Sequence, residues 1–244
     1  MTSAGWSHYT FTVNSRVHTQ GASQDRAYEF IKERVLSCHF KPGQRVNALE
    51  LASKLKISRT PIREALGRLE QEGFVRREDH GGYTVRTMSL KEVIDLYQVR
   101  QPLEVQAALD ALPFVDQSAV AELSAILSEA ADLLAKGNVR AFLLANRKFH
   151  LLLARLTGNT LLYQMLSAIS DRIRLICEMI IHRHSPRATE ILEENLAILE
   201  AVKQREPTAV EGAVRSHIHR AREHATSFFS QQPHYLYVGE QRRR

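Results

Sequence analysis

Two short helical patterns separated by a tight turn constrain the fold of this chain more than any other feature. Residues 47–74, NALELASKLKISRTPIREALGRLEQEGF, predict helices over residues 47–55 and 58–73. Ser58 is a suitable N-cap for the second helix, and Pro61 falls in its first turn, where a missing N–H is tolerated. The apolar positions of this helix are Ile62, Ala65, Leu66 and Leu69. Their spacing predicts that one face is buried.

The flanking segments complete a recognisable arrangement. The preceding pattern predicts a helix over residues 23–39. The following segment, FVRREDHGGYTVRT, predicts a hairpin of two short strands that turns at Gly81 and Gly82. A helix, two short helices and a hairpin together predict a winged helix-turn-helix domain over residues 23–87. Residues 1–22 show no periodicity and are predicted to form a flexible N-terminal arm.

The start of the second short helix is cationic, although the helix dipole favours negative charge there. Four residues project from this end, away from the apolar stripe: Ser58, Arg59, Thr60 and Arg63. In a DNA major groove, arginines bind base edges or phosphates, and hydroxyls bind phosphate oxygens. The N–H groups of a helix start also favour phosphate. We therefore predict that these residues contact double-stranded DNA.

Charge and composition agree with that prediction. Residues 1–88 contain 14 basic and 9 acidic side chains, whereas residues 89–244 contain 19 and 18. A local basic surplus favours contact with a polyanion, although a solvated face could carry the same surplus. The sequence contains no run of about 18 apolar residues, so it predicts no membrane-spanning helix. Because Cys38 and Cys177 are the only cysteines, a reducing compartment is favoured, and we expect a cytoplasmic protein.

From Ser89 onward the pattern is helical and predicts an antiparallel bundle. Ser89 and Glu92 have the spacing of a capping box at its start. Helix-breaking residues divide the segment into helices over residues 89–112, 117–136, 139–157, 159–183, 187–205 and 207–230. The predicted fold is therefore mainly α, with the winged helix-turn-helix followed by an all-helical domain over residues 88–230 and a tail over residues 231–244.

Several polar residues fall within the apolar stripes of these helices. Four helices contribute Arg100, Asn146, His150, Asn195 and His217. Because ligand sites are often built in bundle cores, this pattern favours a polar pocket. A buried arginine needs a partner, and two remain open for Arg100, namely Glu104 one turn later or an anionic ligand. Arg172 could also contribute to the pocket, although its position favours the rim.

The first third of the chain resembles a known family of DNA-binding domains. The segments PGQRV, ELASKLKISRTPIREALGRLEQEGFV and GGYTV, within residues 25–87, are similar to GntR-family bacterial transcription regulators. The resemblance implies that the four residues at the helix start contact DNA, and that a wing glycine, Gly81 or Gly82, approaches the minor groove. Leu49 stands where some relatives have a DNA-contacting arginine, so we expect that contact to be absent.

The rest of the chain resembles the FadR-type carboxy-terminal domain, called FCD. The segments DLYQVRQPLE, NRKFHLLLARLTGN, EENLAILEAV and RSHI occur in the order of that domain over residues 90–228. The resemblance implies a divalent metal held by an aspartate and three histidines, with a carboxylate effector and an arginine beside it. The matching positions here are Asn146, His150, Asn195 and His217, with Arg100 as the anion partner.

Two of these positions depart from the metal-binding pattern. Asn146 replaces the usual aspartate, Asn195 replaces a histidine, and amide oxygens are neutral, weak ligands. His150, His217 and Asn146 could still hold Zn or Ni weakly. The two substitutions favour a metal-free pocket for a small anionic organic molecule.

Together these features predict a ligand-responsive transcription regulator of the FadR subfamily and not an enzyme. We expect a homodimer that reads a palindromic operator and, as a repressor, leaves it when a carboxylate-type effector binds. Two alternatives remain open: a constitutive DNA-binding protein whose bundle only dimerises, and a metal-dependent enzyme that uses His150 and His217. The absence of an HExxH motif, a nucleophile elbow, a phosphate loop and paired carboxylates argues against the enzyme.

Overall fold

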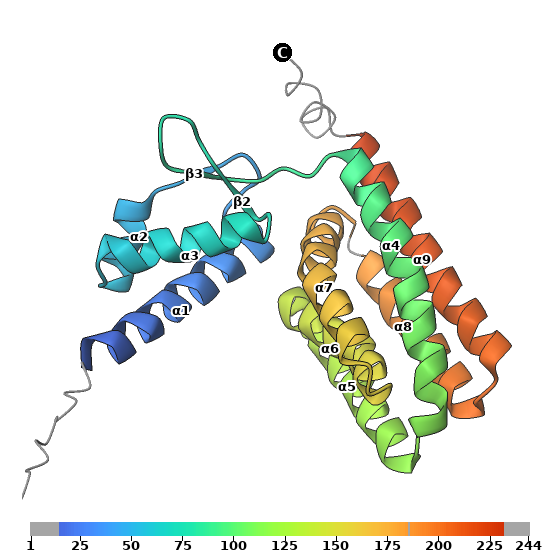
Figure 1. Cartoon of the computed structure of the whole chain (residues 1–244). Helices are drawn as coiled ribbons and strands as arrows, with labels where there is room; N and C mark the ends of the chain where they lie inside the picture. Colours follow the sequence, from blue (N-terminus) through green and yellow to red (C-terminus); the bar gives the residue numbers. More distant parts are fainter. Residues whose placement is uncertain (1–14, 185, 232–244) are drawn as a thin grey trace, which may run out of the picture. The chain divides into compact units, whose positions relative to one another are not determined.

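The computed structural model describes residues 15–184 and 186–231, and these form two compact units (Figure 1). One unit comprises the described residues up to Glu33 together with Gln44–Arg86. The other comprises Arg34–Gly43 and the described residues from Thr87 onward. Each unit has its own core, so the two are described separately.

The first unit contains two helices, all but the last three residues of another, and a small sheet. The helices are α1 (Ser15–Leu36), α2 (Ala48–Leu55) and α3 (Arg59–Gln71), and the strands are β1 (Arg45–Val46), β2 (Val75–Arg77) and β3 (Tyr83–Val85). The strands form an antiparallel sheet in the order β1-β3-β2. This is the predicted winged helix-turn-helix, with β2 and β3 as the wing.

Local sequence signals explain the turn between α2 and α3. The side chain of Asn47 caps α2 by accepting hydrogen bonds from the backbone N–H groups of Leu49 and Glu50. Lys56 ends α2 in the left-handed region, with φ of 54°. The predicted stripe of α3 is completely buried, and burial of each large apolar side chain contributes about 1.5–3 kcal/mol. That burial fixes which face of α3 remains exposed.

Two details of the first unit differ from the sequence prediction. The first helix begins at Ser15 and not at Ser23, so the prediction of a flexible arm was wrong for residues 15–22. This stretch contains no proline, and extending a formed helix costs much less than nucleating one. Strand β1 was not predicted, because two residues are too few to show alternation. Residues 1–14 of the predicted arm and residues 232–244 of the predicted tail lie outside the described part.

The second unit is the predicted helical bundle. Its helices are α4 (Leu90–Ala111), α5 (Gln117–Ala135), α6 (Val139–Leu156), α7 (Thr160–Ile181), α8 (Pro186–Gln204) and α9 (Pro207–Ser230), with a short 3-10 helix, η1, at Leu112–Phe114. The predicted boundaries agree with these to within about two residues, which is the usual ambiguity at helix ends. Figure 1 shows α4 lying along α9, and α5, α6 and α7 lying side by side.

Side-chain caps position the bundle helices. Ser89 and Glu92 form the predicted capping box at the start of α4. The side-chain caps of the next three helices are Asp116, Asn138 and Asn159. A large apolar core and a smaller second cluster fill the bundle, and a few charged and amide side chains are also buried there. None of the helices in the described ranges is long and apolar enough to span a bilayer.

Candidate functional site

The amino end of α3 is exposed and carries no negative charge. Ser58, Arg59, Thr60 and Arg63 are all exposed, as the sequence predicted. Ser58 has extended backbone angles, and its side chain makes no capping hydrogen bond to the helix. No acidic residue lies in the first turn. The helix start therefore presents N–H groups and two guanidinium groups to an external anion.

Ion pairing distinguishes these arginines from others in the same unit. Arg59 and Arg63 make no ion pair within the described ranges. In contrast, Arg68 lies 3.3 Å from the Glu72 carboxylate and stacks 3.6 Å from the centre of the Tyr28 ring. Arg76 lies 3.1 Å from Glu78. Arg68 and Arg76 thus have structural partners, whereas the charges at the start of α3 are uncompensated.

The wing turns through two glycines with positive φ. The φ angles are +79° at Gly81 and +91° at Gly82, a region that other residues rarely adopt. A Cβ atom on Gly82 would also lie only 3.3 Å from Nη2 of Arg45. Leu49, at the start of α2, is 63% exposed and offers an external partner only an apolar contact.

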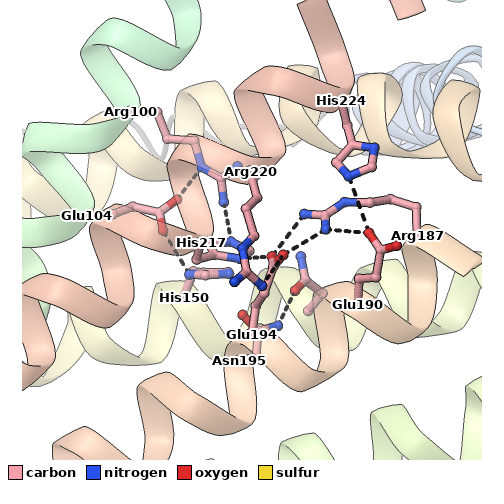
Figure 2. Close-up of polar contacts among 11 residues, drawn as sticks. Arg100, Glu104, His150, Arg187, Glu190, Glu194, Asn195, His217, Arg220 and His224 are labelled. Atoms are coloured by element: carbon pink, nitrogen blue, oxygen red, sulfur yellow. Dashed lines mark hydrogen bonds and ion pairs between the residues drawn. The ribbon is translucent and has the colours of Figure 1, made fainter. Parts of the chain in front are cut away.

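In the bundle, the predicted inward residues form a chain of polar contacts (Figure 2). Arg100 donates from Nε to Oε1 of Glu104 at 2.6 Å, so its structural partner is the one noted from the sequence. The second oxygen of Glu104 lies 2.8 Å from Nδ1 of His150. Nη2 of Arg100 lies 3.3 Å from Nε2 of His217, and the His150 and His217 rings stack with their centres 5.0 Å apart.

The chain continues into α8 through residues that the sequence prediction missed. Nδ1 of His217 lies 2.8 Å from Oε2 of Glu194, and Arg187 donates two hydrogen bonds to the same carboxylate at 2.7 and 2.9 Å. Because an ionised carboxylate can only accept, Nδ1 of His217 carries the proton and Nε2 is an acceptor. Glu194 therefore fixes the tautomer of His217.

The protonation states follow from burial and from these contacts. Burial lowers the pKa of His217 to about 4, although the hydrogen bond with Glu194 acts in the opposite direction. Burial alone would raise the pKa of Glu194, but His217 and Arg187 together lower it to about 2. Burial is likewise outweighed at Glu104, whose pKa is lowered by Arg100 and His150. At neutral pH both carboxylates are ionised and His217 is neutral.

The two asparagines do not fit the metal-binding pattern implied by the resemblance. Nδ2 of Asn195 donates to Oδ1 of Asn146 at 2.5 Å, so the amides bind each other. The oxygen of Asn146 accepts this hydrogen bond with one of its two lone pairs. Among the described His, Cys, Asp and Glu side chains, Glu104, His150 and His217 could together hold a metal ion, since their ligand atoms lie within 4.8 Å of one another. Glu104 was expected only as a partner of Arg100.

Two small cavities adjoin this network, with about 10 and 20 Å³ available to the centre of a water molecule. Both are lined by Arg100, Asn146 and Cys177. The first is also lined by Tyr97, Arg187 and His217, and the second by Glu104, His150 and Arg174. Each cavity therefore has room for about one water molecule, which is well below the volume of a small-ligand pocket. Of the predicted set, Arg100, Asn146, His150 and His217 line these cavities, whereas Asn195 lies beside them through its contact with Asn146.

One predicted pocket residue lies elsewhere, and one pocket residue was missed. Arg172 is not among the residues that line these two cavities, whereas Arg174 is. Two residues along a helix differ by about 200° in direction, which explains the difference. Tyr97 is 1% exposed, and its hydroxyl has no hydrogen-bond partner among the described residues. Its position three residues before Arg100 was the available signal.

The fold and these sites define a class of protein, namely a winged helix-turn-helix DNA-binding transcription regulator with an all-helical carboxy-terminal domain. Residues 23–85 match the family described as bacterial regulatory proteins, gntR family, and residues 95–220 match the FCD domain. The chain belongs to the GntR family and has the FCD architecture of its FadR subfamily. It is a regulator and not an enzyme.

Similar proteins agree with this assignment. The uncharacterized HTH-type transcriptional regulator YdhC of Bacillus subtilis is 31% identical over 198 residues, covering 81% of this chain and 88% of YdhC. The Nta operon transcriptional regulator of Aminobacter aminovorans is 38% identical over 141 residues, covering 57% of this chain and 66% of that protein. The solved structure of E. coli McbR/YncC has a TM-score of 0.75 at 21% identity, covers 85% of this chain and 98% of its own, and shows the same fold.

Proposed function

We propose that the chain binds a palindromic operator as a homodimer, with α3 of each protomer in a major groove. The observation that carries this proposal is the exposed, unpaired pair Arg59 and Arg63 at an uncapped helix start. Ser58 and Thr60 would bind phosphate, and Gly81 and Gly82 would let the wing approach the minor groove. A two-fold axis makes the operator symmetric, because identical helices read its two halves. An operator on the bacterial chromosome places this activity in the cytoplasm.

We further propose that residues 88–230 bind a small carboxylate effector. Arg100 and Arg187 line one cavity with the acceptor and donor groups of Asn146 and His217. Each guanidinium has five N–H donors, so pairing with a glutamate leaves donors for a ligand. Because Arg100 and Arg187 are already paired with glutamates, the net charge of the site adds little to its affinity for the effector. The effector must therefore be recognised mainly by directed hydrogen bonds, including one to the hydroxyl of Tyr97.

Repression with release by the effector is the mode that we propose. A dimer that covers a promoter blocks transcription, and an effector that favours another arrangement of the bundle lowers operator affinity. Such coupling requires the effector to bind the two arrangements with different affinity. The contacts that link α4, α6, α8 and α9 around one cavity are suited to this role, since a ligand there would touch these four helices and α7.

The test combines DNA binding with a ligand screen. Duplexes from the region upstream of the gene are titrated with the purified protein, and small mono- and dicarboxylates are screened by thermal shift with and without EDTA. A regulator binds one duplex specifically and releases it with the acid that raises Tm. A protein that binds DNA but responds to no acid is a constitutive binder, and a protein that ignores every duplex contradicts the whole proposal.

A further inference from the structure

The buried residues Glu104, His150 and His217 have the composition of a transition-metal site. One carboxylate and two imidazoles, with ligand atoms within 4.8 Å of one another, resemble the three-ligand sets that hold Zn in proteins. Nε2 of His150 is buried without a hydrogen-bond partner among the described residues. Hydrogen bonding of Nδ1 of His217 to Glu194 leaves its Nε2 lone pair directed at the cluster, as in carboxylate–histidine–metal arrangements.

A cation of the protein itself already contacts two of these three ligands. The guanidinium of Arg100 donates to Oε1 of Glu104 at 2.6 Å and lies 3.3 Å from Nε2 of His217. Arg100 is 2% exposed and comes from α4, one turn before Glu104. Its positive charge therefore lies between the carboxylate and the imidazole nitrogen that a metal would have to use.

We propose that the guanidinium of Arg100 takes the place of a metal ion in this cluster and prevents one from binding. A divalent ion at the same position would meet a fixed, buried positive charge that cannot be removed by deprotonation. It would also have to break the ion pair between Arg100 and Glu104 inside the protein. The hydrogen bond between Asn146 and Asn195 supports the proposal, because these amides stand where the metal-binding pattern has an aspartate and a histidine and they bind each other.

The decisive experiment removes the guanidinium and measures metal content. Arg100→Met keeps an unbranched apolar side chain but leaves Glu104, His150 and His217 without the internal cation. After incubation with Zn²⁺ or Co²⁺ and desalting, we expect about one ion per chain in this variant and almost none in the wild type. Bound Co²⁺ should show visible absorption, and Zn²⁺ should raise the Tm of the variant, because metal binding compensates the unpaired carboxylate.

Two further variants make the result specific. Arg174→Met removes another buried arginine that lines the second cavity, and we expect it to gain no metal. Arg100→Met combined with His150→Ala should lose the metal that the single variant gains. These measurements use the full chain without DNA or effector, so they are independent of the proposed function.

Three results would overturn the proposal. The first is a wild-type chain that retains one Zn²⁺ after desalting as well as Arg100→Met does. The second is an Arg100→Met variant that folds but binds no Zn²⁺ or Co²⁺. The third is an Arg100→Met variant that does not fold even when expressed and purified with Zn²⁺, because the metal was expected to compensate the unpaired Glu104.

Discussion

Replacing Arg59 with alanine tests the DNA-reading helix directly. Arg59 is exposed and makes no ion pair in the described part, so its removal costs the folded protein no contact there. We expect the free energy of unfolding to change by no more than about 0.5 kcal/mol, as for other surface substitutions. Any loss of operator binding then reports a contact with DNA and not a loss of structure.

The size of the loss follows from the number of contacts. An arginine that binds a base edge with two hydrogen bonds contributes about 1–3 kcal/mol of discrimination. A dimer loses this contact in both half-sites, which gives roughly 2–6 kcal/mol, or a loss of specific affinity from about 30-fold to about 20,000-fold. If Arg59 contacts phosphate instead, specificity is retained and the slope of log K against log salt falls by about 0.9 for each lost contact.

The assay is a titration of the operator and of a scrambled duplex at several salt concentrations, monitored by fluorescence anisotropy. Arg68→Ala is the matched control, because Arg68 lies on the same helix but is paired with Glu72. We expect the control to bind the operator nearly as well as the wild type. Unchanged operator binding and salt dependence in Arg59→Ala would refute the assignment of this helix end, as would an equal loss in both variants.

Three other substitutions test the wing, the pocket and the buried histidine. Gly82→Ala must hold a φ of +91° and should therefore weaken operator binding several-fold. Gly67→Ala is the control and should bind normally, because no neighbouring atom lies within 4 Å of its new Cβ. Equal binding by both variants would contradict the role of the wing. Tyr97→Phe removes a hydroxyl without a hydrogen-bond partner among the described residues, so it should raise the Tm of the ligand-free protein slightly. It should also weaken effector binding about tenfold, whereas Tyr163→Phe should not. Unchanged effector affinity in Tyr97→Phe would exclude a hydrogen bond between the Tyr97 hydroxyl and the effector. Folding lowers the pKa of His217 from 6.5 to about 4, so the unfolded chain binds a proton at this residue before the folded chain does. The stability that His217 contributes is therefore fully present above pH 6.5 and is lost as the pH falls towards 4. Chemical denaturation should show a smaller loss over this range in His217→Gln, and identical pH profiles would contradict the assignment.

The fold was largely predictable because its signals are local. The six bundle helices begin or end at prolines, glycines and capping residues that can be recognised in the sequence, and the stripe of α3 is continuous. The burial of Arg100, Asn146, Asn195 and His217 followed from helical periodicity alone. In both cases the relevant information lies within a few turns of one helix.

The partners of those residues were harder to predict because they depend on packing between helices. Glu194 lies beside Asn195 in sequence but binds His217 on another helix, and Arg187 reaches that carboxylate from one end of the same helix. The mutual contact of Asn146 and Asn195 joins positions 49 residues apart. No periodicity within a single helix indicates which side chains will meet across the bundle.

The contact between Asn146 and Asn195 has a physiological consequence. Neither amide gains or loses a proton in the range of pH that a living bacterium tolerates, and neither competes effectively for a transition metal. If Arg100 takes the place of a metal ion as we propose, effector binding would need no inorganic cofactor. Such a regulator would respond to its metabolite in the same way in zinc-starved and in zinc-rich cells.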